Sequence, residues 1–503
     1  MTLEPSRITP SNNDRETRFE VLRHKIGLVL GPIMFGLVLL APMDGLSPEA
    51  HKLAAIIALV ITFWVTEALP LAVTALLGPM LAVMLQVTSI GPAFAPMANP
   101  IVFLFIGSFI LAQGLFVHRV NERIAYSVLS WKVIGARPTR ILIAYGALAA
   151  FLSAWMSNTA TAAMLVPIGL SLIAFMESES QIPRSYGTAM MLMTAYGCSR
   201  GGMATPVGTP PNLITIAMLD DLLDVQISFV EWMLLAMPAT LVLMGITFVY
   251  LNWIGRTGVK EIPGAEAIIK KRKHALGPWK RGERNAVIAF GVTVCLWVGP
   301  GLLALLLGRE HHLVQLVLTS MPEAVAALTG VVLLFLLPIS ADQRSTITWK
   351  QAAQIDWGTI LLFGGGLALG ALAASTGLAQ VIGEGVLSLA PTTDLVAITF
   401  TAAVFTVVVS EAMSNTAATT ISIPIIISIA QAVGVDPIIP SVAAALSASV
   451  AAMLPVSTPP NAIVYASGRV TITDMLKYGV LWTLTSVVLV PTLVLLIAPT
   501  FLG

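Results

Sequence analysis

The pentapeptide Met-Ser-Asn-Thr-Ala occupies residues 156–160 and occurs again at residues 413–417. A second polar motif, Thr-Pro-Pro-Asn, follows each copy, at residues 209–212 and 458–461. The two copies of each motif are about 250 residues apart. Two unrelated motifs that recur in the same order and at similar spacing indicate that half of the chain has been duplicated.

The composition is that of an integral membrane protein. Of the 503 residues, 56% are hydrophobic and 11% are charged, whereas a soluble globular chain has about 25% charged residues. The net charge of +1 argues against a nucleic-acid partner, and the lipid bilayer is the expected environment. We therefore predict an all-α integral membrane protein. Apolar runs near the length that crosses a hydrocarbon core as a helix are Ile26–Pro42, Leu53–Pro70, Leu71–Ile90, Ile101–Val117, Trp232–Trp253, Ala286–Leu307, Ala324–Pro338, Ile360–Ala374 and Val480–Ala498.

Basic residues predict the orientation, because loops rich in Lys and Arg stay in the cytoplasm. Residues 1–25 carry Arg and Lys but no apolar core of a signal peptide, which indicates a cytoplasmic tail. The linker 256–283 is strongly basic and is also expected in the cytoplasm. Residues 351–468 contain no Lys or Arg, so their loops are expected outside. In the cell inner (plasma) membrane, the N-terminus would then be cytoplasmic and the C-terminus outside.

The segment from Ile141 to Met176 is predicted to be a helical hairpin that enters the membrane and turns back. Its length of about 36 residues is too great for one span and rather short for two spans with a loop. Basic flanks around Lys132 and Arg184 put both ends on the same side of the membrane. Polar backbone at membrane depth survives only where it is buried in protein or lines a cavity. The alternative is two short spanning helices with a polar turn outside.

An odd number of crossings in each half would turn the second copy upside down, which agrees with the basic flanks of the first hairpin and the acidic flanks of the second. Inverted repeats with re-entrant helical hairpins and broken transmembrane helices are typical of secondary transporters, whose substrates bind where the breaks meet. We expect about 11 transmembrane segments. Amphipathic segments after Gly114 and Gly377 are expected to be interfacial arm helices. The predicted divisions are a cytoplasmic tail (1–25), a leading transmembrane helix (26–50), repeat one (51–255), a cytoplasmic linker (256–283) and repeat two (284–503).

The two motifs carry chemistry suited to ions. Ser, Asn and Thr offer hydroxyl and amide oxygens to a hard cation, and O–H and N–H donors to an anion. A pair of prolines removes two backbone donors and interrupts a helix, so that nearby carbonyls are released and a new half-helix begins. The N-terminus of that half-helix is a favourable place for a carboxylate. A single Ser-Asn-Thr would only cap or pack a helix, but the duplication in matched context favours binding.

Paired Ser-Asn-Thr motifs, each followed by a Thr-Pro-Pro-Asn loop, resemble the divalent anion:sodium symporter (DASS) family of sodium-coupled di- and tricarboxylate and sulfate transporters. The resemblance covers nearly the whole chain, including Thr-Glu-Ala-Leu-Pro at residues 66–70. It implies a carrier, not an enzyme, that imports small carboxylates by symport with sodium, with C4-dicarboxylates such as succinate or malate favoured. It also implies a homodimer whose substrate-carrying part moves like an elevator.

The family pattern further implies two sodium sites, with the substrate between the two hairpins. The first sodium ion would be bound by Ser153, Ser157, Asn158 and the backbone of Gly208. The second would be bound by Ser410, Asn415 and the backbones of Met413 and Ser457. The substrate would contact Asn158, Thr159, Thr209, Asn415, Thr416, Thr458 and Pro459.

Other functions stay open. A sodium-independent anion exchanger or a sulfate transporter would share the fold and the hairpins. A cation/proton antiporter or channel is expected to carry buried carboxylates at its helix breaks, for which Glu67, Glu323 and Glu411 are the candidates. A membrane enzyme is disfavoured because the six histidines do not cluster in the sequence. An ATP-driven pump is disfavoured because the sequence has no GxxxxGK[ST] motif.

Arg200 departs from the DASS pattern, in which an apolar residue precedes the Gly-Gly pair seen here at residues 201–202. An arginine in a membrane segment is costly unless it faces protein or water. One interpretation places it in a vestibule, where it bonds helix-end carbonyls. The other makes it a positive charge near the first site that attracts anions or partly replaces sodium. Its counterpart in repeat two, Ser449, is neutral.

Overall fold

The computed structural model describes residues 12–43, 45–180, 182–389, 394–455 and 457–501. Every regular element in these residues is a helix. Ten of the described helices are long and apolar enough to cross a membrane, and the pair α14 and α15, bent by 60°, would make an eleventh span. These helices confirm the prediction of an all-α membrane protein.

The helices of the first half are α1 (Asn12–Leu40), α2 (Pro48–Thr66), α3 (Leu71–Met84), α4 (Ile90–Phe94), η1 (Ala95–Ala98), α5 (Pro100–Val117), α6 (Val120–Leu129), α7 (Pro138–Ser153), α8 (Asn158–Ser180), α9 (Arg184–Met203), α10 (Pro210–Leu223) and α11 (Phe229–Ile254). After α12 (Ala265–Ala275), those of the second half are α13 (Arg281–Leu307), α14 (His312–Ser320), α15 (Glu323–Leu336), α16 (Trp349–Ala352), α17 (Trp357–Ser375), α18 (Leu378–Leu389), α19 (Leu395–Ala412), α20 (Asn415–Val433), α21 (Ile438–Ala448), α22 (Pro459–Ala466) and α23 (Ile472–Phe501).

The N-terminal part of the chain is helical for longer than its polar sequence suggests. Residues 1–11 of the predicted tail lie outside the described residues, and from Asn12 onward the tail is the first part of α1. α12 lies in the predicted linker 256–283. The boundaries of the two repeats and the sidedness of the tail stay predictions.

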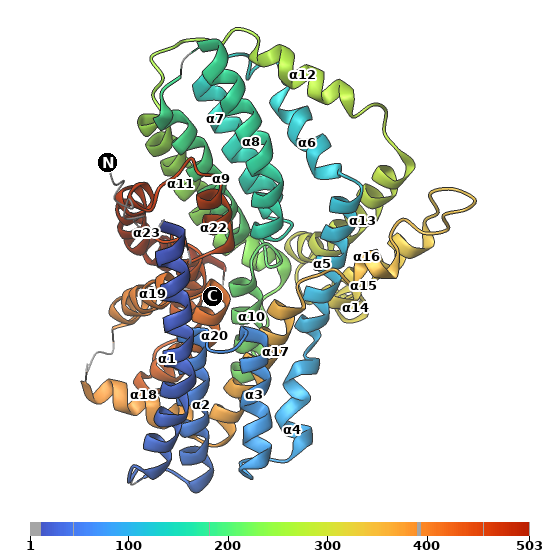
Figure 1. Ribbon diagram of the computed structural model, residues 1–503. Coiled ribbons are helices and arrows are strands. Elements are labelled where there is room, and N and C mark those ends of the chain that lie inside the picture. Colours follow the sequence, from blue (N-terminus) through green and yellow to red (C-terminus); the bar gives the residue numbers. More distant parts are fainter. Residues whose placement is uncertain (1–11, 44, 181, 390–393, 456, 502–503) are drawn as a thin grey trace, which may run out of the picture.

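The two halves repeat the same order of elements in opposite directions. In each half a hairpin (α7 with α8, α19 with α20) is followed by a broken helix (α9 with α10, α21 with α22) and a long helix (α11, α23). α7 and α8 lie in the upper half of Figure 1, whereas α19 and α20 lie in the lower half. The first helix of each hairpin packs on the following broken helix, α7 on α9 and α19 on α21. The fold is therefore that of two inverted repeats.

The re-entrant character of the first hairpin follows from its length. α7 has 16 residues, which at 1.5 Å per residue gives about 24 Å, less than the ~30 Å hydrocarbon core. The chain turns at residues 154–157 and returns as α8. The short α7 supports a hairpin that turns inside the membrane, although α8, with 23 residues, is long enough to cross it.

Small residues let corresponding helices of the two halves approach closely. A methyl group added at Gly107 in α5 would lie 2.6 Å from the Cβ of Ala327 in α15. One added at Gly365 in α17 would lie 2.7 Å from the Cβ of Ala75 in α3. Contacts of this kind are typical of membrane helices, which associate by close backbone packing. Because α5 corresponds to α17 and α3 to α15, the α5–α15 and α3–α17 crossings are equivalent contacts between the two repeats.

The described helices pack in two groups. We refer to α7–α11 and α19–α23 as the hairpin body, because these helices pack mainly on one another. We refer to α1–α5 and α13–α17 as the frame, which is held by the α1–α2, α2–α3, α3–α17, α5–α15 and α13–α15 contacts. Inside the hairpin body, the second helix of each hairpin packs on the half-helix of the other repeat, α8 on α22 and α20 on α10.

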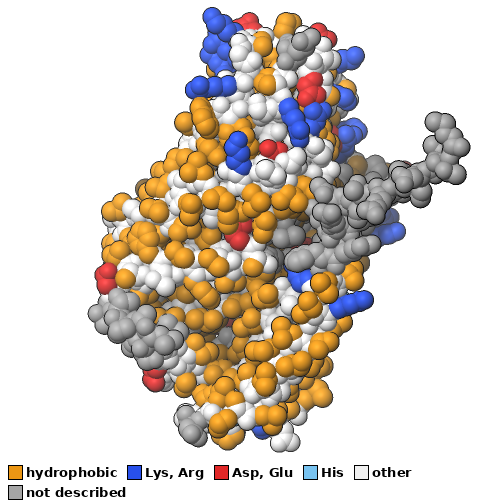
Figure 2. Space-filling model, turned by 60° about the vertical axis from the view of Figure 1, so that its left-hand side comes forward, with side chains coloured by type: hydrophobic (Ala, Val, Ile, Leu, Met, Phe, Trp, Pro, Cys, Tyr) orange, Lys and Arg blue, Asp and Glu red, His pale blue; other side chains and the backbone are white. Residues whose placement is uncertain are grey.

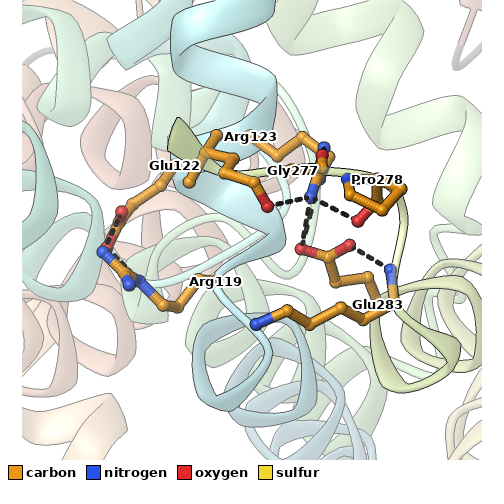
Figure 3. A network of polar contacts seen from close by, with 8 residues as sticks. Arg119, Glu122, Arg123, Gly277, Pro278 and Glu283 are labelled. Carbon is orange, nitrogen blue, oxygen red and sulfur yellow. Dashed lines mark hydrogen bonds and ion pairs between the residues drawn. The ribbon is translucent and has the colours of Figure 1, made fainter. Parts of the chain in front are cut away.

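Two short amphipathic helices connect the groups, as predicted after Gly114 and Gly377. α6 joins α5 to α7, and α18 joins α17 to α19. α6 is fixed by the buried ion pair of Arg123 with Glu283, whose closest N–O distance is 3.0 Å. Arg123 also donates to the carbonyls of Gly277 and Pro278 (Figure 3). The first arm helix is therefore attached to the start of α13.

The surface fits a lipid environment. Figure 2 shows hydrophobic side chains over most of the middle and lower part of the visible face, with Lys and Arg gathered at the upper end. That end holds α12 and the connection between α6 and α7 (Figure 1). Many large apolar side chains are open to the surroundings, among them Leu306 with 80% of its surface exposed. Apolar surface of this extent is stable in a bilayer and not in water, so the chain is a multi-pass membrane protein.

Candidate functional site

The tip of the first hairpin lies against the break between α9 and α10. The break leaves helix-end carbonyls without partners, and Asn212 of the Thr-Pro-Pro-Asn motif binds them. Its Nδ2 donates to the carbonyls of Gly202 (2.9 Å) and Thr205 (2.7 Å). Thr205 Oγ1 in turn donates to the carbonyl of Ala154 at the hairpin tip. Sequence reasoning selected this motif but did not assign the Asn a bracing role.

Glycines allow the hairpin tip to come this close. A methyl group at Gly208 would lie 3.0 Å from the carbonyl oxygen of Ala154, and one at Gly202 would lie 3.1 Å from Asn158 Nδ2. These separations are shorter than ordinary van der Waals contact. Glycine is therefore required at both positions for Asn158 to lie against the break.

Four polar atoms meet at this point. One terminal atom of the Asn158 amide lies 2.5 Å from Ser153 Oγ, 3.1 Å from the carbonyl oxygen of Cys198 and 3.3 Å from that of Gly208. Ser157 takes no part through its side chain, because its Oγ accepts the N–H of Ala160 and caps α8. Ser153, Asn158 and Gly208, all predicted for the first sodium site, are thus brought together.

The amide of Asn158 fits this cluster in two orientations. With Nδ2 toward the cluster it donates hydrogen bonds to Ser153, Cys198 and Gly208. With Oδ1 toward the cluster, it accepts the hydroxyl hydrogen of Ser153, but the carbonyl oxygens of Cys198 and Gly208 face it with no proton between them, which a cation would stabilise. A hard cation prefers such neutral oxygen ligands at a helix break. The cluster is therefore able to exchange a set of hydrogen bonds for a bound ion.

The second hairpin builds a related arrangement, in which the serine and not the amide reaches a carbonyl of the broken helix. Ser410 Oγ lies 2.8 Å from Asn415 Oδ1 and 2.7 Å from the carbonyl oxygen of Ala448 at the end of α21. Ser414 caps α20 by accepting the N–H of Ala417, as Ser157 does for α8. Met413 ends α19 in an extended conformation (φ −148°, ψ −178°). Asn461 braces the second break by donating to the carbonyl of Leu454.

A buried carboxylate binds the chain at the second break, whereas at the first break glycines allow the hairpin tip to pack closely. Glu411, 6% exposed, accepts the N–H groups of Ala452 (2.9 Å) and Met453 (3.2 Å). It also accepts the hydroxyl groups of Ser457 (2.8 Å) and Thr483 (3.1 Å). Ser457, predicted as a backbone ligand of the second ion, is therefore held by Glu411 through its side chain.

The other two carboxylates of the antiporter hypothesis lie away from the α9–α10 and α21–α22 breaks. Glu67 forms an ion pair with Arg23 at 2.9 Å and is half exposed. Glu323 is the first residue of α15, where its Oε1 accepts the N–H of Phe229 at 3.4 Å. Among the described residues no group of three or more His, Cys, Asp or Glu side chains could hold a metal ion. The polar atoms gathered around Asn158 are therefore hydroxyl, amide and carbonyl groups, without a carboxylate.

The residues predicted to contact substrate lie at helix N-termini. Asn158 and Thr159 begin α8, and Asn415 and Thr416 begin α20. Thr209 and Thr458 are the N-cap residues of α10 and α22 and have nearly the same backbone angles (φ −147°, ψ 143° and φ −145°, ψ 146°). Thr159 and Pro459 are exposed, whereas Thr209 and Thr458 are buried. That these seven residues share one pocket stays a prediction.

Arg200 does not lie in a vestibule, because its side chain is fully buried inside the hairpin body. Its contacts are with Tyr196, Val450 and Trp482. Its guanidinium lies 4.9 Å from the ring centroid of Tyr196 and 4.6 Å from that of Trp482 in α23. It donates to the carbonyls of Tyr196 and Val450, both at 3.5 Å. The expected bonds to helix-end carbonyls are present, but on the break of repeat two.

Comparisons with known proteins agree with this architecture. A family model described as the sodium:sulfate symporter transmembrane region matches residues 23–500. The sodium-dependent dicarboxylate transporter SdcS of Staphylococcus saprophyticus is 33% identical, over 98% of this chain and 95% of its own length. The SdcS protein of a Staphylococcus aureus strain is 34% identical, over 95% of this chain and 92% of its own length.

A solved structure shares the fold. The crystal structure of the Alcanivorax borkumensis YdaH transporter matches with a TM-score of 0.55 at 15% identity, covering 95% of this chain and 97% of that one. Identity this low bears on the fold alone. The full-length match to the family and the identity to its relatives, together with paired hairpins and broken helices, show that the chain belongs to the divalent anion:sodium symporter family.

Proposed function

We propose that the protein is a secondary active transporter that imports small di- or tricarboxylates, C4-dicarboxylates first among them, by symport with sodium. The observation that carries this proposal is the pair of oxygen clusters, Ser153 with Asn158 and Ser410 with Asn415. The relatives named sodium-dependent dicarboxylate transporters support the choice of carboxylate over sulfate. A sodium-independent exchanger is the alternative outcome of the test below.

Each cation cluster supports sodium by its ligand type. Hydroxyl, amide and carbonyl oxygens suit a hard monovalent cation, and broken helices supply free carbonyls for it. In the first cluster the ligands would be Ser153 Oγ, Asn158 Oδ1 and the carbonyls of Cys198 and Gly208. In the second they would be Ser410 Oγ, Asn415 Oδ1 and the carbonyl of Ala448, with the backbones of Met413 and Ser457.

The anion would bind between the hairpins. The helices α8, α10, α20 and α22 all begin at the two motifs, and the positive end of a helix favours a carboxylate. Thr159, Thr416, Thr209 and Thr458 would donate hydroxyl hydrogen bonds to it, and Pro459 would contact its carbon skeleton. Because the amides of Asn158 and Asn415 are shared, sodium binding would orient them toward the anion. Coupling would then follow from one amide that serves both solutes.

The division into a hairpin body and a frame supports an elevator movement. The body contains both clusters, and the arms α6 and α18 join it to the frame. The arm α6 is fixed to α13 by Arg123 and Glu283, so the movement would occur at the connection between α6 and α7. The frame would form the contact of a homodimer. The basic end shown in Figure 2 would face the cytoplasm of the cell, with the protein in the inner membrane.

Uptake of labelled succinate into proteoliposomes, with and without an inward sodium gradient, tests the proposal. Uptake driven by sodium and inhibited by unlabelled malate supports it. Uptake that depends only on succinate or another anion loaded inside would assign the protein as an exchanger. Inhibition by sulfate and not by dicarboxylates would assign it as a sulfate transporter.

The variants Asn158→Ala and Asn415→Ala test the site. Each removes an amide that is proposed to contact sodium and anion together, so we expect uptake to fall at least about 100-fold in folded protein. Asn252→Ala is the matched control, because its amide bonds only within α11, to the carbonyl of Phe248. Normal sodium-driven uptake by both site variants would refute the assignment.

A further inference from the structure

The hairpin body contains two buried charges of opposite sign. Among its described residues, Arg200 and Glu411 are the charged side chains with less than a tenth of their surface exposed. Arg200 comes from α9 of repeat one, and Glu411 from α19 of repeat two. Charges at this depth are stable only when they are compensated. The neutral hydroxyl and amide groups of the two clusters do not explain why this pair of buried charges is present.

Arg200 is held against the break of repeat two. Its guanidinium lies 4.9 Å from the ring centroid of Tyr196 and 4.6 Å from that of Trp482, beside the two rings, which stack on each other with centroids 6.3 Å apart. One of its NH groups donates to the carbonyl of Val450, two residues after the end of α21. Cation–π contacts and this carbonyl replace the water that the charge has lost. Arg200 Nε has no hydrogen-bond partner among the described residues, so the compensation is incomplete.

Glu411 binds the same break from the next residues along the chain. It accepts the N–H groups of Ala452 and Met453, directly after the carbonyl that Arg200 binds. The segment 450–453 thus lies between a cation on its carbonyl and an anion on its amides. The two charges also interact electrostatically. The second cation cluster adjoins this segment, because Ser410 precedes Glu411 and binds the carbonyl of Ala448.

The pair has no equivalent at the first break. By the offset between the repeats, Glu411 corresponds to Ala154 and Arg200 corresponds to Ser449. The first cluster is built from neutral atoms and close glycine packing, whereas a carboxylate and a guanidinium act on the second. Two cation sites with the same neutral ligands would therefore differ in electrostatic potential.

We propose that Arg200 is a positioning residue whose fixed positive charge opposes Glu411 and sets the sodium affinity of the second cation site. This inference rests on the proposed sodium coupling. Glu411 attracts the cation, and Arg200 weakens that attraction enough for the ion to be released on each cycle. At an effective dielectric of about 20, one unit charge about 12 Å from an ion changes its affinity by about tenfold.

The proposal predicts effects of opposite sign. Arg200→Met preserves the length and apolar stem but removes the charge, so the sodium concentration for half-maximal uptake should fall at least about fivefold. Glu411→Gln should raise it by about tenfold or more, because the attraction is lost and the repulsion remains. The double variant should return to within about threefold of the wild type. A purely structural arginine would instead weaken sodium binding when removed, as the loss of Glu411 does.

Three controls separate charge from folding. Arg200→Lys keeps the charge without the planar stack, so its half-maximal sodium concentration should stay near the wild-type value even if its thermal stability falls. Arg469→Met removes another arginine of the hairpin body, whose ion pair is with Glu177 and not with residues of the second break. This variant should not change sodium dependence. If Arg200→Met does not fold, Arg200→Gln replaces it in the series.

The measurements are sodium-dependent succinate uptake in proteoliposomes and sodium-dependent thermal stabilisation of the purified variants. If the wild type responds to sodium in neither assay, the proposed function fails. If the wild type responds but Arg200→Met and Arg200→Gln show an unchanged or raised half-maximal sodium concentration, the proposal for Arg200 is wrong and the proposed function stands. If Arg200→Met lowers the half-maximal sodium concentration and the added Glu411→Gln raises it again, the two charges oppose each other as proposed.

Discussion

A methyl group at Gly202 would displace the Asn158 amide while leaving the backbone of the hairpin body in place. The added Cβ of Gly202→Ala would lie 3.1 Å from Nδ2 and 3.2 Å from Cγ of Asn158, and closer still to Oδ1. Ordinary contact distances of 3.5 Å or more require the amide to move by roughly 0.5–1 Å. The contacts of 2.5 Å with Ser153 Oγ and 3.1 Å with the Cys198 carbonyl cannot both survive that shift.

The expected size of the effect follows from the cost of overpacking. An added methyl in a closely packed site costs about 1–3 kcal/mol, and each 1.4 kcal/mol is a factor of ten in affinity. We therefore expect the half-maximal sodium concentration of Gly202→Ala to rise about 5- to 100-fold. Stability should fall little, because the displaced group is the end of a side chain. Gly201→Ala should instead destabilise the fold, because its Cβ would lie 2.6 Å from the carbonyl carbon of Ala150, which is backbone and cannot move aside as a side chain can.

Sodium titration of succinate uptake and thermal unfolding of the purified variants measure the two effects separately. Gly245→Ala is the control, since a methyl group there meets no atom within 4 Å and alanine favours the helix α11. A Gly202→Ala protein with the sodium dependence of the wild type would show that the Asn158 amide is not an ion ligand.

Two further predictions concern the arm and the orientation. Arg123→Met should lower the unfolding free energy by about 3 kcal/mol, because it leaves Glu283 buried without its partner; adding Glu283→Gln should recover part of the loss, and equal thermal unfolding of all three proteins would contradict this. Cysteines placed at Lys132 and Arg184 should react with an impermeant thiol reagent from the cytoplasmic side only, and one at Asp436 from outside only; labelling of the first two from opposite sides would contradict the re-entrant hairpin, because a chain that turns back must return to the side from which it entered.

Much of the architecture was predictable from the sequence because it depends on local pattern. Apolar runs of spanning length predict the membrane helices, which confirm the all-α class. The duplicated motifs predict paired hairpins and breaks, and the described helices turn at residues 154–157 and 413–414 between the hairpin helices. The arm helices after Gly114 and Gly377 were predictable from amphipathic composition. None of these features requires knowledge of what lies beside a residue in space.

The membrane class, the inverted duplication and the chemical types at the hairpin tips could be predicted without a structure, since each depends on consecutive residues. The carbonyls that surround Asn158 could not, because Cys198 and Gly208 are brought to it by the packing of α7 on α9. The tertiary structure also decided the surroundings of Arg200, which belongs to repeat one in sequence and acts on Val450 of repeat two. The physical reason is that a buried charge is stabilised by whatever polar atoms lie within a few ångströms, and spacing along the chain does not fix those neighbours.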